Sequence, residues 1–333
     1  MNSFGRIIRL HIFGESHGES VGFTLDGCPA GMPLSLDDFD RDIERRKGGT
    51  KGTTPRKESD RVIFKSGVFN DKTTGAPITI IFENNNTRST DYERQREVPR
   101  PGHADFVASK KFGGFEDYRG GGHFSGRLTV CLVAAGVIAK KILKEIKVRA
   151  LITEIGGETD IEKGLQRAID AKDTIGGIVE CMVAGLPVGL GEPFFDSVES
   201  VISHAVFAIP AVRGIEFGTG FWSARMFGSQ HNDSIENMDG TTKTNHAGGV
   251  VGGITNGNEF IFRIAIKPTS STPKEQQTLN WQTGEVESFS VKGRHDLCIA
   301  LRVPVVLEAV TAIVLADLLM LEQRIPRIFE SKV

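Results

Sequence analysis

Residues 14–18 of the sequence read GESHG and place a carboxylate, a hydroxyl and an imidazole side by side between two glycines. The imidazole of His17 can exchange a proton near neutral pH, and the flanking glycines let the backbone approach a ligand closely. This combination suits a proton-handling site, although a surface turn can carry the same residues. The segment alone leaves both interpretations open.

A second segment with a histidine is VPRPGHADF, at 98–106, in which His103 stands near an expected helix start with Asp105 close by. A histidine at a helix N-terminus tends to stay neutral, which suits proton transfer near pH 7. The alternative is a histidine that only caps a turn.

Two glycine-rich segments carry basic residues. RRKGGTKGTTPRK, at 45–57, suits recognition of phosphate or carboxylate, with a solvated basic loop as the alternative. RGGGHFSGRLT, at 119–129, has the glycine spacing of a P-loop, but Arg127 and Leu128 stand where lysine and a hydroxyl residue are required. A nucleoside-triphosphate site is therefore excluded, and a glycine-rich turn with an anion-binding helix start remains.

Three later segments could contact a flat or anionic ligand. The glycine pairs of HAGGVVGGITNG, at 246–257, permit close backbone approach, and KPTSS, at 267–271, offers a cation and three hydroxyls. KGRHDLC, at 292–298, groups two charges and an imidazole. No GxGxxG motif follows a strand, so a Rossmann dinucleotide site is not indicated.

Composition argues against several classes of protein. A formal net charge of −2 does not favour a nucleic-acid binder. Cys28, Cys131, Cys181 and Cys298 are far apart and HExxH is absent, so we expect neither disulfides nor a metal site. The apolar run at 130–139 is about half of the ~20 residues that a membrane helix needs. We expect a cytoplasmic protein that contacts no membrane.

The spacing of apolar and turn residues predicts a mixture of strands and helices. Strands are predicted at 21–25, 61–66, 78–82, 147–153, 177–183 and 259–266. Helices are predicted at 35–46, 103–113, 129–145, 192–207 and 303–322. Because strands and helices do not alternate steadily, the pattern favours one layered α+β domain over residues 1–333, with antiparallel pairing. The helix at 129–145 is apolar on most sides, so we expect it inside the domain or in a subunit contact.

Several of these segments resemble, in order, the motifs of the chorismate synthase family. They are GESHGESVGFTLDGCPAG (14–31), RPGHAD (100–105), GGGHFSGR (120–127), AIPAVRGIEFG (208–218), NHAGGVVGGI (245–254), KPTSS (267–271) and GRHDLC (293–298). The resemblance runs from about residue 4 to residue 320. The sequence departs from the usual motifs at RRKGG, at 45–49, where RRRPG is common, and at Leu297, where proline is usual.

The resemblance implies a fold, a reaction and an assembly. The family fold is one α+β domain with helices sandwiched between antiparallel sheets, assembled as a homotetramer. The family reaction is the 1,4-elimination of phosphate from 5-enolpyruvylshikimate 3-phosphate, which gives chorismate in the shikimate pathway of aromatic amino-acid biosynthesis. This lyase reaction requires reduced FMN without net redox change. NADPH can serve as reductant, and the sequence leaves open whether the protein reduces its own flavin.

The resemblance also implies roles for individual residues. The residues that handle protons are His17, His103 and Asp296. The residues that contact FMN are His123, Phe124, Ser125, Pro210, Ala211, Gly252, Lys267, Pro268, Thr269, Ser270, Ser271 and Arg294. The residues that hold the phosphate and carboxylates of the substrate are Arg45, Arg46 and Arg127.

Two other functions remain open at this point. A flavin- or phosphate-binding protein without catalysis, acting as a sensor or scaffold, would keep the same binding residues. A metal-free phosphatase of unrelated mechanism would release phosphate without any flavin. An assay with and without FMN separates the three.

Overall fold

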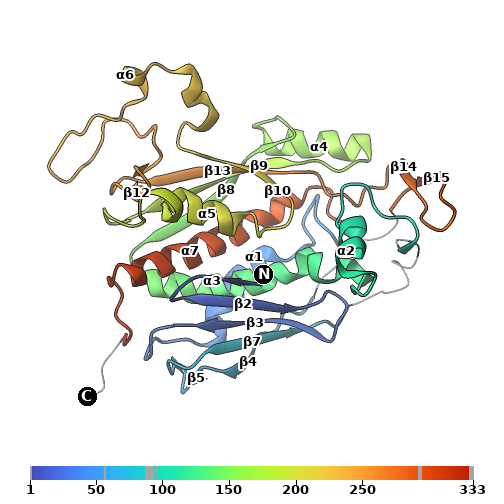
Figure 1. Ribbon diagram of the computed structural model, residues 1–333, viewed down its shortest axis with the longest axis horizontal. Helices are drawn as coiled ribbons and strands as arrows, with labels where there is room; N and C mark the ends of the chain where they lie inside the picture. The colour runs from blue at the N-terminus through green and yellow to red at the C-terminus, as the bar shows by residue number, and fades with distance from the viewer. Residues whose placement is uncertain (1, 56–57, 87–93, 95, 292–294, 330–333) are drawn as a thin grey trace.

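The computed structural model describes residues 2–55, 58–86, 94, 96–291 and 295–329. Two antiparallel sheets enclose a layer of helices, as Figure 1 shows. The predicted α+β architecture, with helices between antiparallel sheets, is therefore confirmed.

The first sheet has the strand order β1-β2-β3-β7-β4, and every neighbouring pair is antiparallel. Its strands are β1 (Ser3–Phe4), β2 (Arg9–Gly14), β3 (Ser20–Asp26), β7 (Ile78–Glu83) and β4 (Ile63–Ser66). Alternate residues of β7, at 78, 80 and 82, are fully buried, because the two-residue period of a strand turns them to one face. The GESHG segment forms the connection between β2 and β3.

The second sheet has the order β10-β13-β9-β8 and is also antiparallel throughout. Its strands are β8 (Lys147–Ile155), β9 (Gly177–Ala184), β10 (Val212–Phe217) and β13 (Phe260–Ile266). The KPTSS segment follows the end of β13 directly. A glycine-free apolar strand such as β13 buries every second residue against the helices.

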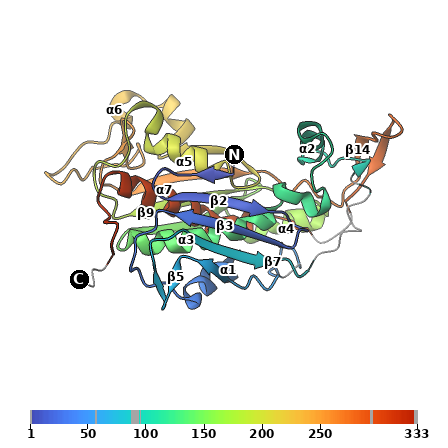
Figure 2. The same ribbon diagram turned by 60° about the horizontal axis from the view of Figure 1, so that its bottom comes forward.

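Helices α1 (Asp40–Arg46), α3 (Thr129–Leu143), α5 (Val198–Val206) and α7 (Val303–Leu321) lie between the two sheets. α3 packs against β3, α7 packs against β8 and β9, and the two helices pack against each other. In the turned view of Figure 2 the first sheet lies across α3. Both helices are apolar on nearly every side, so each needs cover all round. The interior position predicted for 129–145 is confirmed.

The segment Ile299–Leu321, which includes α7, is long and apolar enough to cross a membrane, yet 94% of its most apolar stretch is buried inside the protein. Two buried acids interrupt this stretch. Glu308 accepts a hydrogen bond from Lys140 of α3, and Asp317 accepts the backbone N–H groups of residues 6–8. These bonds attach α7 to its neighbours in the manner of a core helix.

The predicted strands and helices are all present, with their ends shifted by a few residues. Sequence analysis missed β10 and α4 (Ile161–Ala171), which packs on β8 at the outer face of the second sheet. The apolar stripe of α4 is narrow, and Gly164 interrupts it. A side chain there would meet the backbone, because a Cβ at Gly164 would lie 2.3 Å from the carbonyl oxygen of Ile155.

The remaining elements are short or lie at the two ends of the molecule. They are η1 (Leu36–Phe39), β5 (Val68–Phe69), β6 (Lys72–Thr73), α2 (Asp105–Phe112), η3 (Arg119–Phe124), η4 (Gly126–Leu128), η5 (Phe194–Asp196), η6 (Gly220–Arg225), α6 (Gly228–His231), β11 (Val250–Val251), β12 (Ile254–Thr255), β14 (Gln276–Leu279), β15 (Val286–Phe289) and η7 (Ile299–Arg302). In Figure 1, α2, β14 and β15 lie at the opposite end from α6 and β12.

Candidate active site

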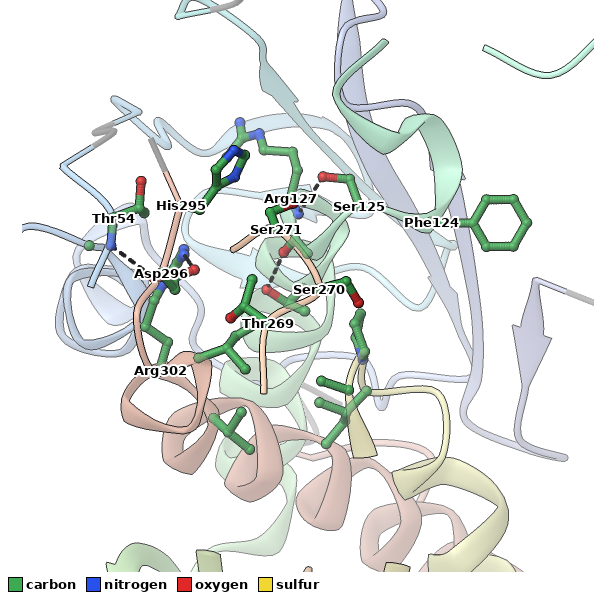
Figure 3. Close-up of a pocket in the computed structure, with 18 of the residues that line it drawn as sticks. Thr54, Phe124, Ser125, Arg127, Thr269, Ser270, Ser271, His295, Asp296 and Arg302 are labelled. Carbon is green, nitrogen blue, oxygen red and sulfur yellow. Dashed lines mark hydrogen bonds and ion pairs between the residues drawn. The ribbon is translucent and has the colours of Figure 1, made fainter. Parts of the chain in front are cut away.

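A cavity of about 400 Å³ opens where the N-terminal ends of α3 and α7 meet the C-terminal end of α1. The residues that line it come from within 46–60, 100–104, 120–129, 209–211, 267–271 and 295–306. Figure 3 shows labelled side chains from several of these segments around the cavity, with the ring of Phe124 directed away from them. Segments far apart in the sequence therefore converge at one place.

Most of the residues assigned by resemblance line this cavity. They are His103 and Asp296 from the proton-handling set, Phe124, Ser125, Pro210, Ala211, Lys267, Pro268, Thr269, Ser270 and Ser271 from the FMN set, and Arg46 and Arg127 from the substrate set. Their roles remain predictions, because convergence gives their position and not their chemistry.

Three consecutive glycines, at 120–122, bring the two predicted catalytic histidines to the same stretch of backbone. All three have positive φ angles, a conformation that suits glycine. A Cβ at Gly120 would lie 2.4 Å from Cδ2 of His17, and a Cβ at Gly121 would lie 3.4 Å from Cε1 of His103. Both imidazoles therefore lie close to this glycine run, although His17 itself does not line the cavity.

His103 belongs to a tightly bonded group at the start of α2. Its Nδ1 lies 2.6 Å from Oδ1 of Asp105, which also accepts a bond from Nη2 of Arg100 at 2.8 Å. Burial raises the pKa of Asp105, but hydrogen bonds from Arg100 and His103 outweigh burial and hold that pKa well below its ordinary range. Arg100 also donates to the hydroxyl of Ser271 and so connects this group to the KPTSS segment.

Asp60 links the two arginines that were predicted to hold the substrate. Its carboxylate accepts hydrogen bonds from Arg46 at 2.6 Å and from Arg127, and all three side chains are almost fully buried. Burial raises the pKa of Asp60, but the charges of Arg46 and Arg127 outweigh burial and keep it below its ordinary value. Arg127 donates further to the side chain of Asn84. The two guanidinium groups are thus held at the cavity wall.

Asp296 lies between two donors, as Figure 3 shows. The backbone N–H of Thr54 donates to its Oδ1 at 2.9 Å, and Nη1 of Arg302 donates to its Oδ2 at 3.0 Å. Arg302 also donates to the backbone carbonyl of Arg46. The predicted proton acceptor is therefore fixed in orientation at the start of α7.

The KPTSS segment brings a cation and a hydroxyl to the same cavity. Nζ of Lys267 donates to Oγ of Ser270 at 2.7 Å and to the carbonyl oxygen of Gly102 at 3.1 Å. Burial, with a smaller effect from the charge of Arg213, lowers the pKa of Lys267. Ala211 beside it has a φ of 74°, a conformation that is rare for a residue other than glycine.

The cavity carries more positive than negative side chains. The cationic residues that line it are Arg46, Lys47, Arg100, Arg127, Lys267 and Arg302. The acidic ones are Glu58, Asp60 and Asp296. Clustered guanidinium groups bind phosphate and carboxylate through parallel hydrogen bonds, so the wall favours an anionic ligand.

Some predicted residues lie elsewhere. Arg45 donates two hydrogen bonds to Glu308, both at 2.7 Å, and does not line the cavity. His123 bonds to the carbonyl oxygen of Gly14 and lines a separate, mainly apolar cavity of about 380 Å³. Gly252 lies between β11 and β12, at the other end of the molecule from α2 in Figure 1. Arg294 lies outside the described residues.

Sequence analysis did not assign three residues that hold the site together. Arg100 stands within the RPGHAD motif, and its charge next to His103 was an available signal. Arg302 stands directly before the apolar run of α7, where a single cation is also noticeable. Asp60 gave no comparable signal, because it meets Arg127 only through folding.

The chain matches members of one protein family over nearly its whole length. A family model described as chorismate synthase matches residues 8–320. A chorismate synthase from Chitinophaga pinensis is 71% identical, over 99% of this chain and 100% of the relative. Another from Dehalococcoides mccartyi is 44% identical, again over 99% of this chain and 100% of the relative.

A solved structure agrees with these relatives. It is described as the crystal structure of chorismate synthase and superposes with a TM-score of 0.74 at 26% sequence identity, covering 96% of this chain and 93% of that chain. The residues matched by the family model include β2, β3, β4 and β7 of the first sheet, the whole second sheet and every segment that lines the cavity. The chain therefore belongs to the chorismate synthase family.

Proposed function

We propose that this protein eliminates phosphate and a proton from 5-enolpyruvylshikimate 3-phosphate to give chorismate, with reduced FMN bound and no net redox change. One observation carries the proposal: a cavity with an excess of guanidinium groups also receives Asp296 and an imidazole, while a second imidazole lies behind the same glycine run. A substrate with a phosphate and carboxylates needs this combination of charge and proton carriers.

The arginines at the cavity suit the charges of such a substrate. Arg46 and Arg127 line the cavity, and Asp60 fixes the orientation of both guanidinium groups, which suit recognition of a phosphate or carboxylate. A donor that is oriented toward developing charge often lowers a reaction barrier by about 3 kcal/mol. These two residues would therefore bind the substrate and stabilise the departing phosphate.

The cavity residues of the segments 210–211 and 267–271 suit FMN. A cavity of about 400 Å³ falls within the size range of small-molecule sites, and the cation and hydroxyls of 267–271 are a suitable donor set for a phosphate group. Lys267, Ser270 and Ser271, with Pro210 and Ala211, would hold the cofactor. The chemistry that reduced FMN would supply there is transient electron donation without net redox change.

Proton transfer falls to the two histidines and the aspartate. His17 and His103 would hold protons near the flavin and the departing phosphate. Positioned imidazoles raise the rate of such reactions by on the order of 10²- to 10⁴-fold. Asp296, whose carboxylate Thr54 and Arg302 hold at the cavity, would help to remove the proton that the substrate loses. The protein would thereby bind and orient the substrate and the cofactor and move protons at the reacting centre.

We further propose that the protein works as a cytoplasmic homotetramer. Contact between Gly252 and an FMN in this cavity would require a second copy, because residues within 100–104 line the cavity just before α2, and β12 lies at the opposite end of the molecule from α2 in Figure 1. The cysteines are free, and burial raises the pKa of Cys28, Cys131 and Cys181 to about 12, so these thiols suit a reducing compartment. NADPH as the reductant of the flavin is part of the same proposal.

An anaerobic assay tests the reaction. Purified protein is incubated with 5-enolpyruvylshikimate 3-phosphate and dithionite-reduced FMN, and chorismate and phosphate are both measured over time. We expect equal amounts of the two products, and none when FMN is left out or stays oxidised. A parallel assay with NADPH in place of dithionite tests whether the protein reduces its own flavin.

Other results of this assay point to the other functions. Phosphate released without FMN would identify a phosphatase. FMN binding by folded protein, with neither product formed, would identify a flavin-binding protein without catalysis. Either result would reject the proposed reaction.

A further inference from the structure

Asp105, the first residue of α2, contacts His103 and Arg100 at the same time. Its Oδ1 lies 2.6 Å from Nδ1 of His103, and its two oxygens accept bonds from Nε and Nη2 of Arg100, each at 2.8 Å. The side chains of Arg100, Asp105 and His103 are 5%, 14% and 21% exposed, so water has limited access to these bonds. The arrangement is a bidentate ion pair with an imidazole attached to it.

The short contact determines where the hydrogen on the ring lies. An ionised carboxylate and an unprotonated ring nitrogen are both acceptors, and two acceptors 2.6 Å apart would repel. A hydrogen must therefore lie between them. The bidentate pair with Arg100 keeps Asp105 ionised, so Nδ1 of His103 carries the hydrogen.

The second neighbour of Nδ1 does not change this conclusion. Nη2 of Arg100 lies 3.0 Å from Nδ1, but a guanidinium can only donate. Once Nδ1 is itself a donor, the hydrogens of Nη2 are directed to Oδ1 of Asp105 at 2.8 Å. The carboxylate thus accepts from both neighbours.

The other ring nitrogen, Nε2, faces the glycine run, where a Cβ at Gly121 would lie only 3.6 Å from it. His103 lines both the main cavity and a smaller one of about 170 Å³. The charged residues that share these cavities with His103 are Arg46, Lys47, Glu58, Asp60, Arg100, Arg127, Lys267, Asp296 and Arg302 in the main one, and Arg96, Asp105, Glu116 and Asp117 in the smaller one. None of the other carboxylates is bonded to His103 as Asp105 is, within the residues that the structure describes.

We propose that Asp105 is a positioning residue: it fixes His103 in the tautomer with hydrogen on Nδ1 and makes Nε2 the atom that exchanges protons at the cavity. The consequence for turnover rests on the proposed function, whereas the tautomer itself does not. A carboxylate that holds a catalytic imidazole in one tautomer can account for several orders of magnitude in rate, as in serine proteases.

The tautomer can be measured directly. Protein labelled with ¹⁵N in its histidine rings, and the His103→Gln variant for assignment, would give the ring nitrogen shifts of His103 by NMR. We expect a protonated Nδ1 and a pyridine-type Nε2 in neutral His103. In Asp105→Asn we expect the two nitrogens to exchange character, because the amide can keep its oxygen on Arg100 and donate its N–H to the ring.

Kinetics then test the consequence. We expect Asp105→Asn to lower kcat by about 10²- to 10⁴-fold while KM for the phosphorylated substrate changes little. Asp42→Asn is a matched control, since Asp42 is similarly buried and bonded to Arg45 and Lys140, and among the described residues its ion pairs are with these cations and not with a histidine. Arg45 keeps its bonds to Glu308 in that variant, so we expect wild-type kinetics.

The outcomes separate this inference from the proposed function. An active wild type whose Asp105→Asn variant turns over at the same rate, or a wild-type His103 with its hydrogen on Nε2, would overturn the inference. The NMR result on the wild type decides the matter even if Asp105→Asn does not fold. A wild type without turnover would refute the proposed reaction and leave the tautomer measurement valid.

Discussion

Carboxylates hold the guanidinium groups of the cavity in place. The pairs are Asp60 with Arg46 and Arg127, Asp105 with Arg100, and Asp296 with Arg302. Because each arginine already has a fixed partner, less side-chain freedom is lost when an anion binds. The free N–H groups of these arginines are thereby oriented as well as charged.

The Asp60 cluster predicts how stability depends on pH. The folded pKa of Asp60 is below its ordinary value, so its ionised form contributes stability above the unfolded pKa of about 4, and this contribution is lost as pH falls through the lower folded value. We expect Asp60→Asn to destabilise the protein by about 3–5 kcal/mol at pH 7. The difference from wild type should shrink below about pH 4.

Urea unfolding of both proteins between pH 3 and pH 7 would measure this. Asp26→Asn is a suitable control, because Asp26 forms a pair with Arg9 that is largely exposed to solvent. A difference between wild type and Asp60→Asn that stays constant with pH would show that the charge of Asp60 is not the cause.

The residue types at the site could be predicted from sequence better than their partners. His103, Asp296 and Arg127 stand in motifs that the resemblance picks out. Arg45 and Arg46 are neighbours in sequence, yet the helix turns one into the α1–α7 contact and the other toward the cavity. Only the fold decides between them, because successive helical residues point about 100° apart.

The tightest contact between elements is that of α3 with α7. A Cβ at Gly136 of α3 would lie 2.2 Å from Cβ and 2.4 Å from Cα of Ala309 on α7. Backbone atoms cannot move aside as the end of a long side chain can. This one glycine therefore sets how closely the two core helices approach.

We expect Gly136→Ala to destabilise the protein. Alanine favours a helix over glycine by about 1 kcal/mol, but overpacking against a backbone costs about 1–3 kcal/mol and separates two helices that both sheets depend on. Urea unfolding would measure the change. Gly228→Ala is a control, since a Cβ there meets nothing within 4 Å, and an equally destabilised control would contradict this explanation.

Elements could be predicted where their apolar pattern was broad. α3 and α7 are apolar on nearly all sides, and this predicted their interior positions. α4 was missed although its signal was available: Ile161, Leu165, Ala168 and Ile169 recur at helical spacing after the N-cap Asp160, and all four face the protein interior. Gly164 within this pattern lowers its helix propensity and argued against it.

At the scale of the whole molecule, one hydrophobic core runs from the first sheet through the helices to the second. It includes Phe23 and Ile80 on one side and Phe260 and Val179 on the other. The helices between the sheets lose the cover of one side if either sheet unfolds. The chain should therefore unfold as a single unit.

Buried cysteines allow a test of this expectation. Cys28 lies after the first sheet's β3, and Cys181 lies in β9 of the second sheet; both thiols are buried and free. We expect pulse labelling with a thiol reagent, followed by mass spectrometry, to give the same urea midpoint for both. Separate midpoints would indicate two domains and contradict the single domain predicted from sequence.

The layered architecture could be predicted because strand and helix segments were recognisable and did not alternate. The arrangement of the site could not, because its segments are loops beside β10 and β13, the glycine-rich run and three helix ends, which are far apart in the sequence. Glycine-rich motifs indicated close backbone approach, and 120–122 fulfils this, but nothing in the sequence indicated that His17 and His103 would both lie against this run.

The position of α7 also bears on the biosynthesis of the protein. α7 follows every strand of both sheets along the chain, so a ribosome releases all of them before the helix that joins them exists. Until then the inner face of the second sheet, against which α7 packs, lacks this cover, and an exposed apolar face attracts chaperones or leads to aggregation. Burial of that face is therefore completed only after α7 has been made and has packed against it.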